Sequence, residues 1–214
     1  MRLSQRFAFA VAILLLVGCA TTRPVDMSQP RRLVGTENGV RVDALVVTEQ
    51  LSPSSSVAIS YDITNERSVP IAVADLVPES SYDPETRTVT VTFGSEVPGY
   101  SFLPRLLLIP AGAKKSFSSR AVVNVRAIGS SVAGSFGRFP NGLRVKVHFL
   151  TDLQPFSPLI GIPERALHDP KLADALLPKW LERNETIITN VLPMRWVGPF
   201  GGEDDPAAAR RRQP

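Results

Sequence analysis

The sequence has few of the residues that build covalent or metal cross-links: among 214 residues there are one cysteine, Cys19, and two histidines. A disulfide joins two cysteines, and a structural zinc site usually takes four cysteine or histidine ligands. The histidines, His148 and His168, are twenty residues apart and do not form a metal-spaced pair. The sequence therefore excludes a disulfide within the chain and predicts no metal site.

Long apolar runs and an excess of charge are also missing. The apolar run at residues 7–17 would span roughly 16 Å as a helix, against roughly 30 Å for a hydrocarbon core. The net charge is +4, to which Arg2 and Arg6 contribute two and the run at 210–212 three more. The part between is nearly neutral, without the basic face of a nucleic-acid-binding domain. We expect neither a membrane-spanning helix nor a nucleic-acid partner.

The first residues have the order of a secretory signal peptide. Residues 1–6 carry two positive charges and no acidic residue, and the apolar run follows. Small residues, Gly18, Cys19 and Ala20, come directly after it. A basic segment, an apolar segment and small residues in this order are typical of export signals. We predict a signal peptide over residues 1–18.

Leu16, Val17, Gly18 and Cys19 resemble the lipobox of bacterial lipoproteins, over the first two dozen residues only. The resemblance implies cleavage before Cys19, a diacylglyceryl thioether on its sulfur and an acylated amino group. Two or more acyl chains anchor stably, because each buried CH₂ contributes roughly 0.8 kcal/mol. Ala20 in place of aspartate resembles the lipoproteins that a Gram-negative host passes to its outer membrane. We expect a lipid-anchored envelope protein, facing the periplasm in such a host, with no cofactor besides the lipid on Cys19.

Polar, proline-containing sequence flanks the central part of the chain. Residues 19–38 are expected to form a flexible tether behind the lipid. The tail at 199–214, with its acidic and basic clusters, is expected to be disordered. One folded domain over residues 39–198 remains, because this length suits a single hydrophobic core.

Apolar and polar residues alternate cleanly in three segments of this domain, at 56–65, 87–93 and 143–150. This period of two predicts half-buried strands of an antiparallel sheet, with one face on a core and one in water. Less regular segments are also strand-like, and they lie at 40–51, 70–77, 102–109, 116–126 and 186–197. Between them, Asn141-Gly142 predicts a tight reversal.

Seven or eight short strands separated by turn residues predict an all-β fold, an antiparallel β-sandwich. Over residues 40–150 the pattern resembles immunoglobulin-like or fibronectin-type-III-like modules of secreted bacterial proteins. The resemblance is one of pattern, and the inter-sheet disulfide of immunoglobulin domains has no counterpart here. A small β-barrel is the alternative.

One segment, residues 168–184, has a helical pattern and is expected to form a short insertion near the C-terminus. Asp169 suits the N-cap and Pro170 the first helical position. An apolar stripe recurs every four residues, at Leu172, Leu176 and Trp180. Pro178 is expected to end or kink the helix after about two turns.

No set of catalytic residues stands out. Residues 133–137 resemble the G-x-S-x-G nucleophile motif, but Ala133 replaces the first glycine and Ser135 lies in a Gly/Ser-rich loop. His148 is expected on the outer face of a strand and His168 in a loop. Asp75 has no partner carboxylate in the sequence pattern. We predict no catalytic residue.

The large aromatic residues near the C-terminus leave two interpretations. Trp180 on its helical stripe is typical of a core residue, but Trp180, Trp196 and Phe200 could instead form an exposed patch that contacts a partner. The sequence thus favours a non-enzymatic lipoprotein whose sandwich binds an envelope protein, through an edge strand or the helix. The alternative is an envelope hydrolase or small-ligand binder whose site forms only in three dimensions.

Overall fold

The computed structural model describes residues 31–48, 50–52, 55–94, 102–123, 139–164 and 166–197. These residues belong to one compact unit that begins at Arg31. The predicted signal peptide at 1–18 and the tail at 199–214 lie outside the described residues. The structure is built mostly of β-strands arranged in several sheets, with one longer helix and one short helix among the described residues.

The first large sheet is antiparallel and has the strand order β1-β2-β4-β10. Its strands are β1 (Arg32–Glu37), β2 (Val40–Val46), β4 (Ser55–Asn65) and β10 (Lys114–Val123). In β4, alternate residues from Val57 to Ile63 are buried, and those between them are more exposed. The alternation over 56–65 therefore predicted this strand and its buried face correctly.

Strand β1 lies in a segment that was expected to be tether. Its six residues pair with β2 along their whole length, and Leu33 is fully buried. The two strands are joined at Asn38 (φ 49°) and Gly39 (φ 71°). Positive φ at both central residues is the geometry that Asn-Gly hairpin turns favour, since it matches the twist of the strands. The tether expected over 19–38 was therefore too long by at least β1.

The other Asn-Gly pair does not make the expected reversal. Gly142 is the first residue of β11 and pairs with Thr88 on one side and Pro193 on the other. A Cβ atom at Gly142 would lie 2.7 Å from Cγ1 of Val191. Close packing against Val191 and against Thr88, not a turn, accounts for glycine at this position.

The second large sheet has the order β6-β7-β11-β5-β9, and β13 and β14 also pair with β11. The strands are β5 (Ile71–Ala74), β6 (Glu79–Asp83), β7 (Thr88–Phe93), β9 (Leu106–Ile109), β11 (Gly142–Leu150), β13 (Asn184–Ile188) and β14 (Leu192–Pro193). Strands β7 and β11 are parallel, which corrects the expectation of purely antiparallel pairing. Parallel neighbours need a long connection, and the chain from β7 to β11 provides one by first forming β8 (Phe102–Pro104), β9 and β10.

For β7, the alternating pattern predicted one face correctly and the other incorrectly. Val89 and Val91 are buried as expected, but Thr88 and Thr90, expected on the wet face, are 4% and 7% exposed. Strand β7 lies between β6 and β11, and Nε of Arg144 on β11 donates to Oγ1 of Thr90 at 2.9 Å. Side chains from neighbouring strands therefore contribute to covering this face.

Short strands raise the number of described strands above the seven or eight expected. Strand β3 (Gln50–Leu51) pairs with β15 (Arg195–Trp196), and β8 (Phe102–Pro104) pairs with β12 (Ala166–His168). Each of these four has only two or three residues, too few for a periodic pattern to be recognised.

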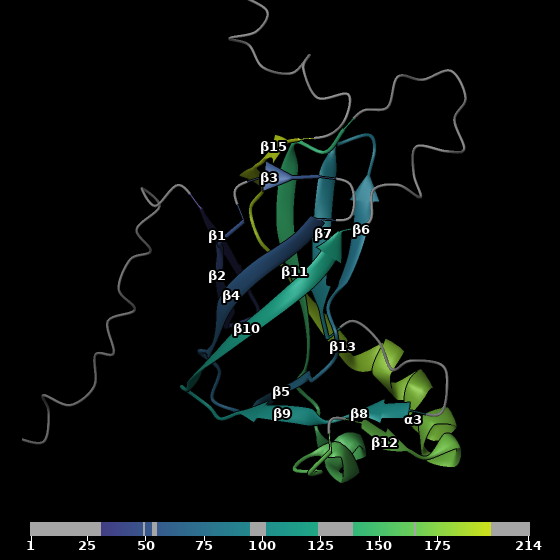
Figure 1. Ribbon diagram of the computed structural model, residues 1–214. Helices are drawn as coiled ribbons and strands as arrows, with labels where there is room; N and C mark the ends of the chain where they lie inside the picture. Colours follow the sequence, from purple (N-terminus) through teal and green to yellow (C-terminus); the bar gives the residue numbers. More distant parts are fainter. Residues whose placement is uncertain are drawn as a thin grey trace, which may run out of the picture. The chain divides into compact units, whose positions relative to one another are not determined.

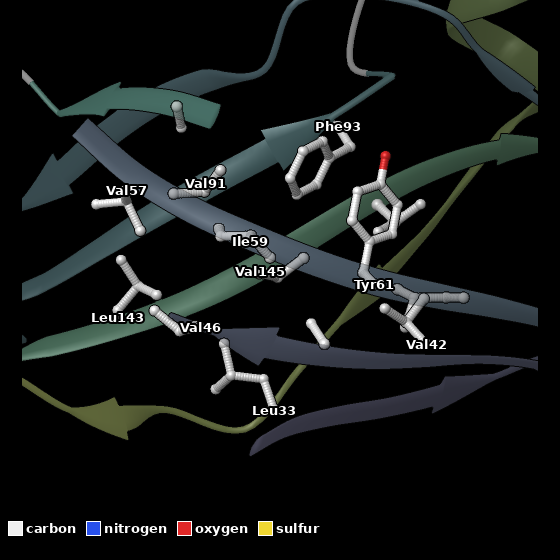
Figure 2. Packing of buried hydrophobic residues seen from close by; sticks show 14 of the residues in the cluster. Leu33, Val42, Val46, Val57, Ile59, Tyr61, Val91, Phe93, Leu143 and Val145 are labelled. Carbon is white, nitrogen blue, oxygen red and sulfur yellow. The ribbon is translucent and has the colours of Figure 1, made fainter. Parts of the chain in front are cut away.

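Buried residues of the two large sheets form one hydrophobic cluster. Val42 and Ile59 from the first sheet lie with Val91, Leu143 and Val145 from the second (Figure 2). Strands β4 and β10 cross over β7 and β11 as a separate layer (Figure 1). The main core is therefore made by apolar faces of both sheets.

Helix α3 (Pro170–Arg183) starts as predicted, with Pro170 at its first position. Oδ1 of Asp169 accepts a hydrogen bond from the backbone N–H of Leu172 at 3.0 Å. The helix continues through Pro178, which corrects the expectation that it could end there after about two turns. Pro178 is exposed, while Leu176 and Trp180 are buried. We attribute the continuation to the burial of these two side chains.

The buried side of α3 contributes to a second, smaller hydrophobic cluster. Leu176 and Trp180 pack there with Phe156 and Leu159 of a short 3₁₀ helix, η1 (Gln154–Leu159), and with Leu103 of β8. In Figure 1, α3 lies beside β8 and β12. In the part of the chain that the structure describes, no helix is long and apolar enough to cross a membrane.

Candidate functional site

The residues of the predicted lipid anchor, Leu16, Val17, Gly18 and Cys19, lie outside the described residues, as does Ser135 of the G-x-S-x-G-like segment. The same holds for Phe200, one of the three aromatic residues considered for partner contact. These predictions therefore remain predictions. The other candidates, Trp180, Trp196, His148, His168 and Asp75, are described.

Trp180 is a core residue. Its side chain is 1% exposed, and its ring meets that of Phe156 edge-on, with 5.6 Å between centroids. This burial agrees with the interpretation of Trp180 as a core residue and not with the exposed patch, since its indole has almost no surface that a partner could contact. Trp196 is half-buried, stacks on Phe139 with 5.2 Å between centroids and packs against the main core. The two tryptophans belong to different clusters and do not form one patch.

His148 is on the outer face of β11, as expected, but it is half-buried. Its Nδ1 lies 2.6 Å from Nδ2 of Asn184. Burial, assisted by the positive charge of Lys146, lowers the pKa of His148 below its ordinary value of 6.5. The hydrogen bond with Asn184 and the charge of Glu79 act in the opposite direction, without cancelling the shift.

The remaining polar candidates lie on separate elements. His168 is exposed on β12, so its expected loop is a short strand. Asp75 follows β5, and its Oδ2 accepts from Nη2 of Arg105 at 2.6 Å in an ion pair. Within the described ranges, no three His, Cys, Asp or Glu residues are placed to hold a metal ion.

A pocket opens where β10 passes the end of β5. It has a volume of about 70 Å³, and Tyr61, Phe93 and Phe117 form part of its lining. The centroid of the Tyr61 ring is 4.3 Å from that of Phe93 and 5.0 Å from that of Phe117. Figure 2 shows the Phe93 ring beside that of Tyr61. Ser118 and Ser119 of β10 also line the pocket, so it lies directly against this strand.

Strand β10 is the last strand of its sheet, and two hydrogen bonds show how its backbone is oriented. On the β4 side, the carbonyl of Ala113 accepts from the N–H of Asn65 at 2.9 Å. On the other side, the carbonyl of Val122 accepts from the hydroxyl of Ser80 in β6 at 2.8 Å. Successive residues of a strand direct their N–H and C=O groups to opposite sides. Ser116, Ser118 and Arg120 therefore direct theirs away from β4.

The charges on β10 are all positive. Nζ of Lys114 lies 2.9 Å from Oδ2 of Asp62. Burial acts to raise the pKa of Asp62, but hydrogen bonds with Ser116 and Lys114 and the charge of Lys114 lower it below its ordinary value. Lys115 is half-buried and Arg120 exposed. The ion pairs seen among the described residues include neither of them.

The sequence predicts the β10 edge, defined as residues 114–120 with the adjacent pocket, only in part. The pattern indicates a strand over residues 116–126, which leaves out Lys114 and Lys115 and does not show that the strand lies at the edge of its sheet. The usable signal is the alternation itself: the inward positions of this segment hold Phe117 and Ala121 but also Lys115 and Ser119. Inward polar and charged residues are typical of edge strands, where they discourage unwanted pairing.

Comparisons of the chain with protein-family models, with curated proteins and with solved structures gave no match.

Proposed function

We propose that this chain is a lipid-anchored, non-enzymatic lipoprotein of the bacterial cell envelope that binds a protein partner in an envelope assembly. The signal-like segment at 1–18 and the lipobox-like residues before Cys19 support the anchor. In a Gram-negative host, Ala20 favours the outer membrane, with the domain in the periplasm. We further propose that the two sheets and their shared core form an immunoglobulin-like sandwich.

The observation that carries the partner-binding role is the β10 edge. A terminal strand with outward-directed backbone groups can accept a further strand from another protein. The adjacent aromatic pocket offers a place for a side chain of that strand. The described titratable candidates, His148, His168 and Asp75, lie on separate elements and support no catalytic set.

The anchor is tested by replacing the modified residue. We expect Cys19→Ala to leave the domain folded and to release the protein from membranes, because no acyl chain would remain to hold it. The measurement is the distribution between pellet and supernatant after a high-salt wash of membranes, with circular dichroism as the check of folding. A Cys19→Ala protein that still pellets after this wash would contradict the lipid anchor.

Partner binding is tested by crosslinking in living cells, followed by purification from the membrane fraction. We expect one partner in near-equal amount, lost in the Cys19→Ala variant because that form leaves the membrane. Recovery of the wild-type protein alone would contradict the assembly role.

A further inference from the structure

We propose that the β10 edge binds an extended acidic segment of the partner as an added β-strand, with one branched aliphatic side chain of that segment in the pocket. This proposal rests on the proposed function and specifies its recognition surface. The segment would lie along residues 116–120, because β6 contacts β10 further on, at Val122.

The backbone geometry provides the first requirement for strand addition. Ser116, Ser118 and Arg120 each direct one N–H and one C=O away from β4, at alternate positions along the strand. An incoming strand pairs with such groups through main-chain hydrogen bonds, which give affinity with little dependence on sequence. Side-chain pockets at alternate positions then provide specificity.

The pocket provides the second requirement. Phe117 lies opposite Tyr61 in the β10–β4 pairing, so the two rings share one face and form an apolar wall. A volume of about 70 Å³ is roughly half of the 150 Å³ cavity that accommodates benzene. A valine or isoleucine side chain fits this space better than an aromatic ring. The one carboxylate in the lining, that of Asp75, is paired with Arg105.

The charged side chains of β10 indicate which kind of strand the β10 edge binds. Asp62 is paired with Lys114, which leaves Lys115 and Arg120 as the uncompensated charges of this edge among the described ion pairs. A second copy of the chain, pairing β10 with β10, would bring these cations together, and like charges on paired strands are destabilising. A partner strand carrying glutamate or aspartate is attracted instead. We therefore assign the edge to an acidic partner strand and not to self-association.

Two substitutions at one position isolate the backbone contribution. Ser118→Pro removes an N–H that points away from β4, so the β10–β4 pairing keeps its hydrogen bonds; proline is tolerated on such an edge. Ser118→Ala removes the same hydroxyl but keeps the N–H and is the matched control. The full chain in detergent micelles would be titrated against a labelled peptide of alternating glutamate and valine, with binding followed by fluorescence polarisation.

We expect Ser118→Pro to weaken peptide binding about tenfold, because one hydrogen bond is lost and the ring obstructs the approaching strand. Ser118→Ala should bind as the wild type does. Bound peptide should also slow deuterium exchange of the β10 amides in the wild type, as added strand pairing requires. Equal affinities of the proline and alanine variants, or unchanged exchange of β10, would overturn the proposal.

The roles of the charges and of the pocket can be tested without Ser118→Pro, so these tests stand even if that variant does not fold. Arg120→Glu, at an exposed side chain, should weaken binding of the acidic peptide roughly threefold at low salt and less at high salt. A lysine–valine peptide should bind more weakly than the glutamate–valine peptide. Alanine in place of valine leaves the pocket empty and phenylalanine exceeds its volume, so both should bind more weakly than valine. A preference for the lysine peptide or for phenylalanine would refute the proposed occupant.

The cellular experiment separates this proposal from the proposed function. If crosslinking recovers one stoichiometric partner from wild-type cells and Ser118→Pro does not reduce its yield relative to Ser118→Ala, the β10 edge is not the recognition surface. The partner-binding role then still stands. If the wild-type protein is recovered alone, the partner-binding role fails, and peptide titration still decides whether β10 accepts an acidic strand.

Discussion

His148 is a titratable side chain that the fold half-buries. It shares the outer face of β11 with Lys146, and its Nδ1 contacts Asn184, the residue at the junction of α3 and β13. A strand residue on an outer face is ordinarily solvated, which is why the sequence predicted a surface histidine. The half-burial comes from a neighbouring strand and a helix end, which the local pattern does not reveal.

The lowered pKa of His148 predicts a pH dependence of stability. The unfolded chain takes up a proton near pH 6.5, whereas the folded chain takes it up only at lower pH. The contribution is therefore fully present above pH 6.5 and is lost as the pH falls through the folded-state pKa. We expect His148→Gln to reduce the loss of unfolding free energy on acidification below pH 6.5. Urea denaturation on both sides of pH 6.5 measures this.

The control for that experiment is His168→Gln, which changes the exposed histidine of β12. This substitution controls for the loss of an imidazole as such. Parallel stability curves for wild type and His148→Gln would show that His148 does not contribute.

At the scale of elements, local pattern predicted best where each element has a regular apolar face. Strands β4 and β11 were recognised because their apolar residues alternate without interruption. Strand β6 was missed because Glu79, Ser80 and Ser81 carry no apolar period, and β1 because its segment was grouped with the proline-containing tether. Those two strands form through pairing with β7 and β2 respectively.

Helix α3 depends on its first turn for part of its stability. We expect Asp169→Ala to lower the free energy of unfolding by about 1 kcal/mol, because the N–H of Leu172 would lose its side-chain acceptor. The matched control is Asp174→Ala, which removes an exposed carboxylate from the same helix and should change stability by less than about 0.5 kcal/mol. Thermal or urea denaturation distinguishes them, and equal losses would show that the cap contributes nothing particular.

At the scale of the whole described unit, Glu185 connects segments that are distant in the sequence. Its Oε2 accepts from Nδ2 of Asn38 at 2.8 Å, and its Oε1 from Oγ1 of Thr151 at 2.7 Å. Nη1 of Arg67 lies 3.4 Å from Oε1. Asn38 belongs to the β1–β2 turn, Arg67 follows β4 and Thr151 follows β11. One carboxylate thus links the two sheets at one end of their shared core.

We expect Glu185→Ala to lower the free energy of unfolding by about 1–3 kcal/mol, because the partly buried donors of Arg67 and Thr151 lose a charged acceptor. Glu185→Gln keeps one acceptor oxygen and should lose less. Glu182→Ala, at an exposed position of α3, is the control for removing a carboxylate. Urea denaturation gives the three values, and a Glu185→Ala protein as stable as Glu182→Ala would show that the link is not stabilising.

The sequence by itself determined the buried faces of β4 and β11 and the start of α3. These features follow from local rules: side chains of a strand alternate between two faces, and a capping side chain acts within one turn. The lipid anchor at Cys19 is likewise a local pattern, and it remains a prediction from sequence. Only the tertiary structure decided that β7 pairs in parallel with β11, that Thr90 is covered and that β10 stays at the edge. Each of these depends on which distant segments become neighbours, and that choice is made by packing of the whole unit.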